Sequence, residues 1–113
     1  MLTIYHNTRC SKSRQTLELI KENTSKAIKI VEYLKEPITE ENIKELLTQL
    51  SCSPIEMMRV KETEFSEQNL KGADDKTLIA AMVSTPKLIE RPIVSDGIKA
   101  IIGRPPTNVL ILC

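Results

Sequence analysis

The sequence predicts one α/β domain, a small mixed sheet with helices on its faces. Three observations support this fold class: a strand–helix–strand pattern in the first 33 residues, helical periodicity through the middle, and β-branched runs around an Asp-Gly turn near the end. A length of 113 residues is that of a single domain. We therefore assign residues 1–113 to one domain, with a helical insertion over roughly residues 38–85.

The first part of the chain has the pattern of a βαβ unit. Leu2–Tyr5 is a short apolar run, Ser11–Asn23 has a helical apolar face, and Ala27–Tyr33 is rich in β-branched residues. Two strands joined by a helix are expected to pair in parallel, with a right-handed crossover.

The middle of the chain predicts a block of helices. After Pro37, Thr39 can cap a helix with Ile43, Leu46, Leu47 and Leu50 on one face. The stretch Ser53-Pro54-Ile55-Glu56 is a capping box, so a short helix should start there and carry Met57, Met58 and Arg59. A further helix should start at Asp74 or Asp75 and end before Pro86.

The last quarter predicts a β-hairpin. Pro92-Ile93-Val94 and Ala100-Ile101-Ile102 flank an Asp96-Gly97 turn. We expect Asn108–Leu112 to form a short terminal helix, with a strand as the alternative.

Composition argues against several classes of function. The 16 basic residues nearly balance the 15 acidic ones, and only three residues are aromatic, so a dedicated nucleic-acid surface is not expected. No run is long enough to span a membrane, and the N-terminus lacks a signal-peptide pattern, so we expect a cytoplasmic protein. We also expect it to be a monomer. Three widely spaced cysteines and one histidine predict neither a disulfide framework nor a bound metal.

Cys10 has the features of a reactive thiol. It stands where the first strand gives way to the first helix, and Arg9, Lys12 and Arg14 surround it in sequence. A helix N-terminus and nearby cations both favour the thiolate, and the same N-terminus can bind an oxyanion. His6 lies four residues away and either polarises Cys10 or hydrogen-bonds the loop backbone.

Three arginines could supply an oxyanion site. Arg59 follows the Ser53 capping box, while Arg91 and Arg104 each precede a proline at a strand end. Arginine offers a planar fork of donors that fits an oxyanion, and the stiff backbone beside proline would place the side chain well. Either proline could also be cis.

Together, these segments resemble one family along nearly the whole chain. Tyr5-His6-Asn7-x-x-Cys10-x-x-Ser13-Arg14 is similar to the active-site loop of the glutaredoxin-coupled arsenate reductases. Leu88-Ile89-Glu90-Arg91-Pro92-Ile93-Val94, Gly103-Arg104-Pro105-Pro106 and Met57-Met58-Arg59 resemble that family's later motifs. Thr8 departs from the family pattern, which commonly has proline there. The chain length and the motifs Cys10-Ser11-Lys12-Ser13-Arg14 and Ile102-Gly103-Arg104-Pro105-Pro106 resemble those of a short, arsenate reductase-like subgroup.

The resemblance implies a thioredoxin-like fold and a role in arsenic detoxification. Cys10 would attack arsenate, His6 would tune its thiolate, Arg59, Arg91 and Arg104 would hold the oxyanion, and Pro92 would be cis. Glutathione would be a co-substrate and glutaredoxin a partner, with no bound cofactor. Two alternatives stay open: an Spx-type redox-responsive regulator of RNA polymerase, and a glutathione-dependent reductase of another substrate. Ser13 stands where Spx-type proteins carry a second cysteine, which favours an enzyme.

Overall fold

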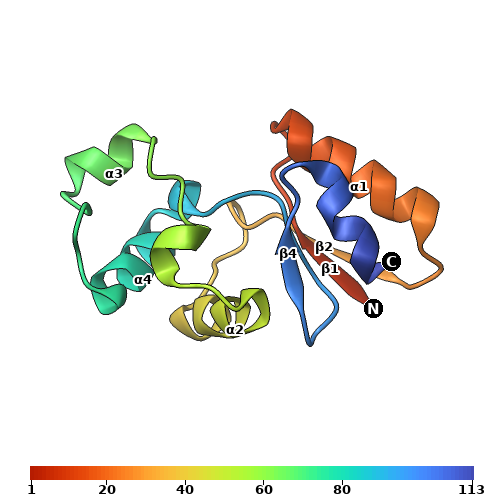
Figure 1. The fold of residues 1–113 in the computed structure, drawn as a ribbon. Helices are drawn as coiled ribbons and strands as arrows, with labels where there is room; N and C mark the ends of the chain where they lie inside the picture. The colour runs from red at the N-terminus through yellow and green to blue at the C-terminus, as the bar shows by residue number, and fades with distance from the viewer. The chain divides into compact units, whose positions relative to one another are not determined.

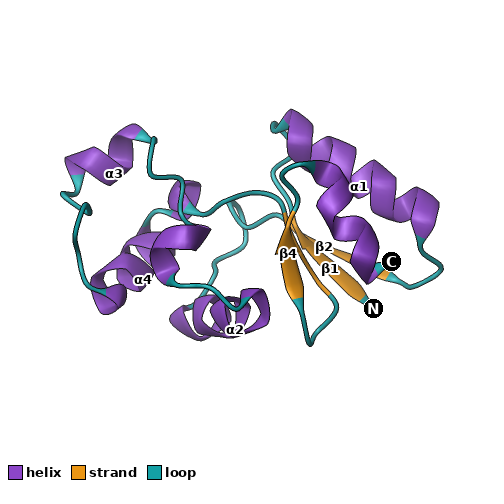
Figure 2. Ribbon diagram, viewed as in Figure 1, coloured by secondary structure: helices purple, strands orange, loops and turns teal.

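The computed structural model describes residues 1–113 and contains a four-stranded mixed sheet (Figure 2). The strands β1 (Leu2–Tyr5), β2 (Ile28–Val31), β3 (Ile93–Ser95) and β4 (Ala100–Ile102) lie in the order β2-β1-β3-β4. β1 pairs with β2 in parallel, and β3 pairs antiparallel with both β1 and β4. The predicted βαβ unit and the C-terminal hairpin are therefore confirmed.

Two helices cover one face of this sheet. α1 (Ser11–Asn23) and the 3₁₀ helix η3 (Pro106–Leu112) lie side by side there (Figure 1). The core between helices and sheet is made of aliphatic side chains from β1, α1, β3 and η3: Leu2, Ile4, Ile20, Val94, Val109 and Leu112. Burial of these side chains supplies the main driving force for this packing.

The chain separates into two compact units. One comprises Met1–Glu36 and Arg91–Cys113 and contains the sheet, and the other comprises Pro37–Glu90. The second unit thus extends beyond the predicted insertion of residues 38–85 at both ends. That the two units make one domain stays a prediction.

The regular elements of the second unit are all helices. It contains α2 (Glu40–Leu50), η1 (Pro54–Met57), α3 (Thr63–Glu67), α4 (Asp75–Ser84) and η2 (Pro86–Leu88). Thr39 caps α2 in a full capping box with Asn42, and the Asp74 carboxylate caps α4 by accepting from the Thr77 N–H. These N-caps start the helices where the sequence predicts.

Two predictions about elements need correction. The second strand is shorter than Ala27–Tyr33, because the chain already turns after Val31, where the Lys35 and Glu36 N–H groups donate to the Glu32 carbonyl. The helix at Ser53 is a single 3₁₀ turn that ends at Met57, so Arg59 is not helical. Instead, Met58 bridges Ile89, and the Arg59 N–H donates to the Leu88 carbonyl over 2.7 Å.

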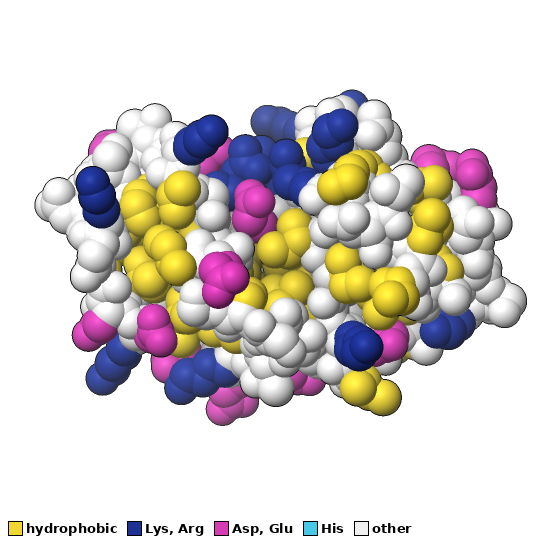
Figure 3. Space-filling view, viewed as in Figure 1, with side chains coloured by type: hydrophobic (Ala, Val, Ile, Leu, Met, Phe, Trp, Pro, Cys, Tyr) yellow, Lys and Arg dark blue, Asp and Glu magenta, His cyan; other side chains and the backbone are white.

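The surface carries both signs of charge. Basic and acidic side chains are both present, among apolar ones, on the face drawn in Figure 3. None of the helices combines the length and the apolar character needed to cross a membrane.

Candidate active site

Cys10 occupies the N-cap position of α1. Its backbone is extended (φ −92°, ψ 121°), its N–H donates to the Asn7 carbonyl over 3.0 Å, and its carbonyl accepts from the Arg14 N–H over 3.0 Å. The chain from Asn7 to Cys10 is thus a closed turn that delivers the sulfur to the start of the helix. Unpaired N–H groups of the first helical turn face outward at this position.

The surroundings of Cys10 favour the thiolate. Partial burial acts to raise the pKa of the thiol, but hydrogen bonds from the Ser13 N–H and the Arg91 side chain, with the Arg91 charge, outweigh it and leave the pKa below its ordinary value. Two N–H groups of the first turn, those of Lys12 and Ser13, contribute. The helix start and a cation therefore act together, as the sequence analysis expects.

Arg91 and Arg104 both reach the Cys10 sulfur. Nη2 of Arg104 lies 3.6 Å from Sγ, and the Arg91 side chain hydrogen-bonds the Cys10 sulfur. Nε of Arg104 donates to the Arg91 carbonyl over 2.8 Å, which ties the two arginines to one another. Nε of Arg91 is buried and has no hydrogen-bond partner.

Each of these arginines precedes a cis proline. The Arg91–Pro92 and Arg104–Pro105 peptide bonds are both cis. The two segments also meet directly, because the Gly103 N–H donates to the Pro92 carbonyl over 2.8 Å. Gly103 lacks a side chain where one would collide: a Cβ there would lie 2.8 Å from Thr16 Oγ1 and 2.9 Å from Pro92 Cγ.

His6 contacts Ser13 and not Cys10. Its Nδ1 lies 2.6 Å from Ser13 Oγ, and that hydroxyl also accepts from the Asn7 N–H over 3.1 Å. Burial lowers the pKa of His6, opposed by Glu32 and aided by Arg14, so the ring is neutral at pH 7. Ser13 was not predicted as the partner of His6, although its place one helical turn after Cys10 is a usable signal.

Arg59 belongs to the helical unit and is already paired. Its Nε lies 3.1 Å from Glu62 Oε1, and its Nη1 lies 3.2 Å from Glu90 Oε1. The hydrogen bond from Arg59 lowers the pKa of the Glu62 carboxyl against the effect of burial. The structure brings Arg91 and Arg104 to Cys10, whereas the convergence of Arg59 on that thiol stays a prediction.

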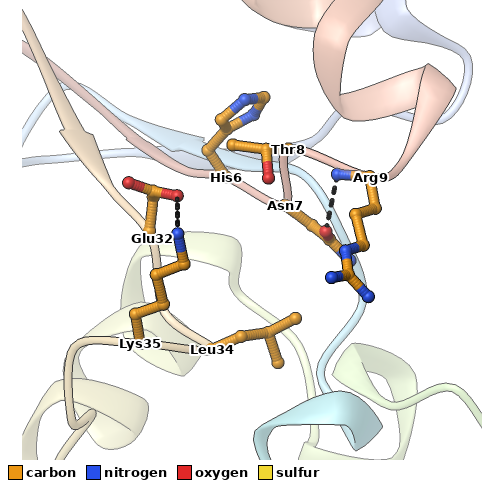
Figure 4. Close-up of a pocket in the computed structure, with 7 residues that line it drawn as sticks. All are labelled: His6, Asn7, Thr8, Arg9, Glu32, Leu34 and Lys35. Atoms are coloured by element: carbon orange, nitrogen blue, oxygen red, sulfur yellow. Dashed lines mark hydrogen bonds and ion pairs between the residues drawn. The ribbon is translucent and has the colours of Figure 1, made fainter.

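A cavity of about 250 Å³ lies beside the same loop (Figure 4). Its lining comes from the residues after β1 and after β2: His6, Asn7, Thr8, Arg9, Glu32, Leu34 and Lys35. No group of three or more His, Cys, Asp or Glu side chains is placed to hold a metal ion.

A thiol activated at a helix start beside two arginines can attack an electrophilic oxyanion, and the sequence as a whole matches a family that fits this chemistry. Residues 5–112 match the ArsC family. The chain belongs to the ArsC family.

Relatives of this ArsC chain cover nearly its full length. It is 49% identical to the uncharacterized protein YfgD of Escherichia coli (strain K12), over 95% of this chain and 92% of that one. It is 38% identical to an arsenate reductase of Neisseria meningitidis serogroup A, over 96% and 94% of the two chains. The structure of an arsenate reductase from Vibrio cholerae superposes with a TM-score of 0.91 at 45% identity, covering 99% of this chain and 97% of that chain. The predicted thioredoxin-like α/β fold and the family are therefore confirmed.

Proposed function

We propose that this ArsC protein is an arsenate reductase that uses glutathione and glutaredoxin. The observation that carries the proposal is the convergence of Arg91 and Arg104 on the Cys10 sulfur. A lone reactive thiol needs no second arginine, whereas an attack on an oxyanion brings negative charge to the same place.

The first step is attack by the Cys10 thiolate on arsenic. A Cys10–S–As bond forms, one As–O bond breaks, and the oxygen leaves as water after taking up protons. Nε of Arg91 is buried and unpaired, so an arsenate oxygen would supply the hydrogen bond that this donor lacks. Arg104 would hold a second oxygen, and Arg59 would join them when substrate is bound.

The second step needs an external thiol. Glutathione attacks the Cys10 sulfur, an S–S bond forms, and the S–As bond breaks with its electron pair moving to arsenic. Arsenic(V) leaves as arsenic(III), and Cys10 is left as a mixed disulfide with glutathione. The thiol of glutaredoxin then takes the glutathione and restores the Cys10 thiol by exchange.

His6 would act on the thiolate through Ser13. The Ser13 side chain is fully buried and bound to His6, while its backbone N–H bonds the Cys10 sulfur. Holding Ser13 in place therefore holds one of the donors that stabilise the thiolate.

A coupled assay tests the proposal. Arsenate, glutathione and glutaredoxin are supplied, and NADPH consumption is followed through glutathione reductase. We expect turnover that Cys10→Ser abolishes, and that Arg91→Lys reduces because lysine lacks the bidentate fork. The absence of arsenate-dependent turnover in the wild type, with active glutaredoxin present, would contradict the proposal.

The pairing of Arg59 favours a second candidate. Two carboxylates already hold its guanidinium, which weakens it as an oxyanion ligand. A glutathione-dependent reductase of a disulfide substrate would need only the Cys10 thiolate. Turnover of a glutathione mixed disulfide without any response to arsenate would support this candidate.

A further inference from the structure

We propose that the cavity beside the Cys10 loop is a glutathione subsite in which Glu32 and Lys35 hold the γ-glutamyl end. This inference rests on the use of glutathione in the proposed function, and it assigns the residues that select it. The cavity holds about 250 Å³, far more than a tetrahedral oxyanion fills, and its rim carries charges of both signs.

His6 brings a ring nitrogen to the lining of the cavity. The residue is only 5% exposed, it lines the cavity, and Nδ1 is its only ring atom in a hydrogen bond. Because Ser13 Oγ accepts from the Asn7 N–H, its own proton can go to His6 Nδ1, which leaves the His6 proton on Nε2. A ligand oxygen in the cavity would pair this donor.

The charges in the cavity are complementary to those of glutathione, a tripeptide. Glu32 and Lys35 lie side by side, with Lys35 Nζ 3.5 Å from Glu32 Oε1, and both are open to solvent. An exposed pair of this kind is weak, so it can exchange its partners for those of a ligand. The ammonium of the γ-glutamyl group would form an ion pair with Glu32, and its carboxylate would form one with Lys35.

The opposite side of the cavity fits the other end of glutathione. Figure 4 shows Arg9 across the cavity from the Glu32–Lys35 pair, with Leu34 between them. The Arg9 side chain makes no hydrogen bond or ion pair in the structure, so it is free to bind the glycine carboxylate. Leu34, 49% exposed, offers apolar surface to the γ-glutamyl methylenes.

The cavity is lined by the turn that ends at Cys10. Arg9 is the residue before Cys10, and Asn7 closes the same turn through its carbonyl. A tripeptide held at its two ends would keep its central cysteine over this turn. Attack of the Cys10 thiolate on one sulfur of glutathione disulfide then forms the Cys10–glutathione disulfide, breaks the original S–S bond and releases one glutathione thiolate.

Thiol exchange without arsenate tests the subsite. The readout is a ratio of two rate constants for thiol–disulfide exchange at Cys10. The rate constant with glutathione disulfide is divided by the rate constant with 2-hydroxyethyl disulfide, which is neutral and lacks the peptide. Lys35→Glu should lower this ratio about tenfold, because an attraction becomes a repulsion. The matched control is Lys29→Glu, an exposed site on β2 with the same change of charge, which should leave the ratio near the wild-type value. An equal fall in both variants, or no fall in Lys35→Glu, overturns the subsite.

A titration separates the subsite from the proposed reaction. S-methylglutathione cannot exchange, so it reports binding alone, and it should shift the backbone amide resonances of residues 7–9 and 32–35 saturably. The absence of saturable shifts there overturns the subsite even if arsenate is reduced. Binding and selectivity without arsenate turnover would instead show that the substrate assignment failed and the subsite stands.

Discussion

Replacing Gly103 with alanine probes the packing that holds Arg91 and Arg104 together. The new Cβ would lie 2.8 Å from Thr16 Oγ1, 2.9 Å from Pro92 Cγ and 3.2 Å from Thr16 Cγ2. These separations are well inside van der Waals contact, so one of the neighbours must move.

Neither neighbour can move cheaply. Thr16 is fully buried on α1, and its hydroxyl donates to the Lys12 carbonyl over 2.8 Å. Pro92 is a rigid ring whose carbonyl accepts from the Gly103 N–H. Overpacking of this kind costs about 1–3 kcal/mol, and we expect Gly103→Ala to lose that much free energy of unfolding.

A double-mutant cycle measures the collision itself. Thr16→Ala removes both atoms of Thr16 that the new Cβ meets, at a loss of about 1 kcal/mol for the buried hydroxyl and methyl. In urea unfolding, the double variant should be more stable than the sum of the single effects predicts, by about 1 kcal/mol or more. Additive effects would refute the reasoning, because they would mean that Gly103 and Thr16 do not compete for space.

The same variant should disturb the thiol. Displacement of the Gly103 segment moves Arg104, whose Nη2 lies 3.6 Å from Cys10 Sγ. We therefore expect the pKa of Cys10, read from alkylation rate against pH, to rise in Gly103→Ala and to fall back in the double variant. An unchanged pKa would show that Arg104 does not depend on this packing.

Further predictions concern charges, a helix cap and the last cysteine. Arg91→Gln should raise the pKa of Cys10 seen in the alkylation profile, because a hydrogen bond and a charge that stabilise the thiolate are lost; an unchanged profile would contradict this role. Thr39→Ala should lower the free energy of unfolding in urea by about 1 kcal/mol, with Thr39→Ser close to wild type, since the hydroxyl caps α2. The folded-state pKa of Glu62 lies below its unfolded value of 4.5, so its contribution to stability is present above pH 4.5 and is lost as the pH falls through the folded-state pKa. Glu62→Gln should therefore flatten the acid limb of the plot of unfolding free energy against pH. An identical acid limb in the variant would count against the ion pair with Arg59. Cys113→Ser should keep full glutathione-dependent activity in the coupled assay, and a large loss would point to an internal disulfide.

Local signals were enough to predict most of the fold. The start of α1 follows from a polar run after a short strand, and the caps at Thr39 and Asp74 follow from side chains that satisfy free N–H groups. The five residues Thr63–Glu67 of α3 were missed because so short a helix has no periodicity to detect. Arg59 was placed on a helix wrongly, because its pairing with the Leu88 strand segment is a long-range contact that a capping box does not report.

The candidate site was predictable only where chemistry and position coincide in sequence. Cys10 carries its own signal, a cysteine at a helix start. The partner of His6 depends on side-chain direction: Ser13 is seven residues away, yet the first helical turn folds its hydroxyl back toward the ring. The two carboxylates on Arg59 could not be predicted, since Glu90 is 31 residues from it and no periodic pattern links them.

The positions and acidities of the other two cysteines support the proposal of an external thiol. Burial raises the pKa of the Cys113 thiol against the effect of Lys26, and burial followed by the charge of Glu56 raises the pKa of Cys52, so neither is a ready nucleophile at neutral pH. Cys113 is also at the wrong end of α1: Lys26, just past the C-terminal end of that helix, donates to the Leu112 carbonyl over 2.9 Å, whereas Cys10 precedes the helix. A helix of 13 residues is about 20 Å long, and a disulfide needs Cα atoms within about 7 Å. Cys10 and Cys113 therefore cannot pair while α1 and η3 stay packed, which supports the proposal that the reductant is a small thiol from solution.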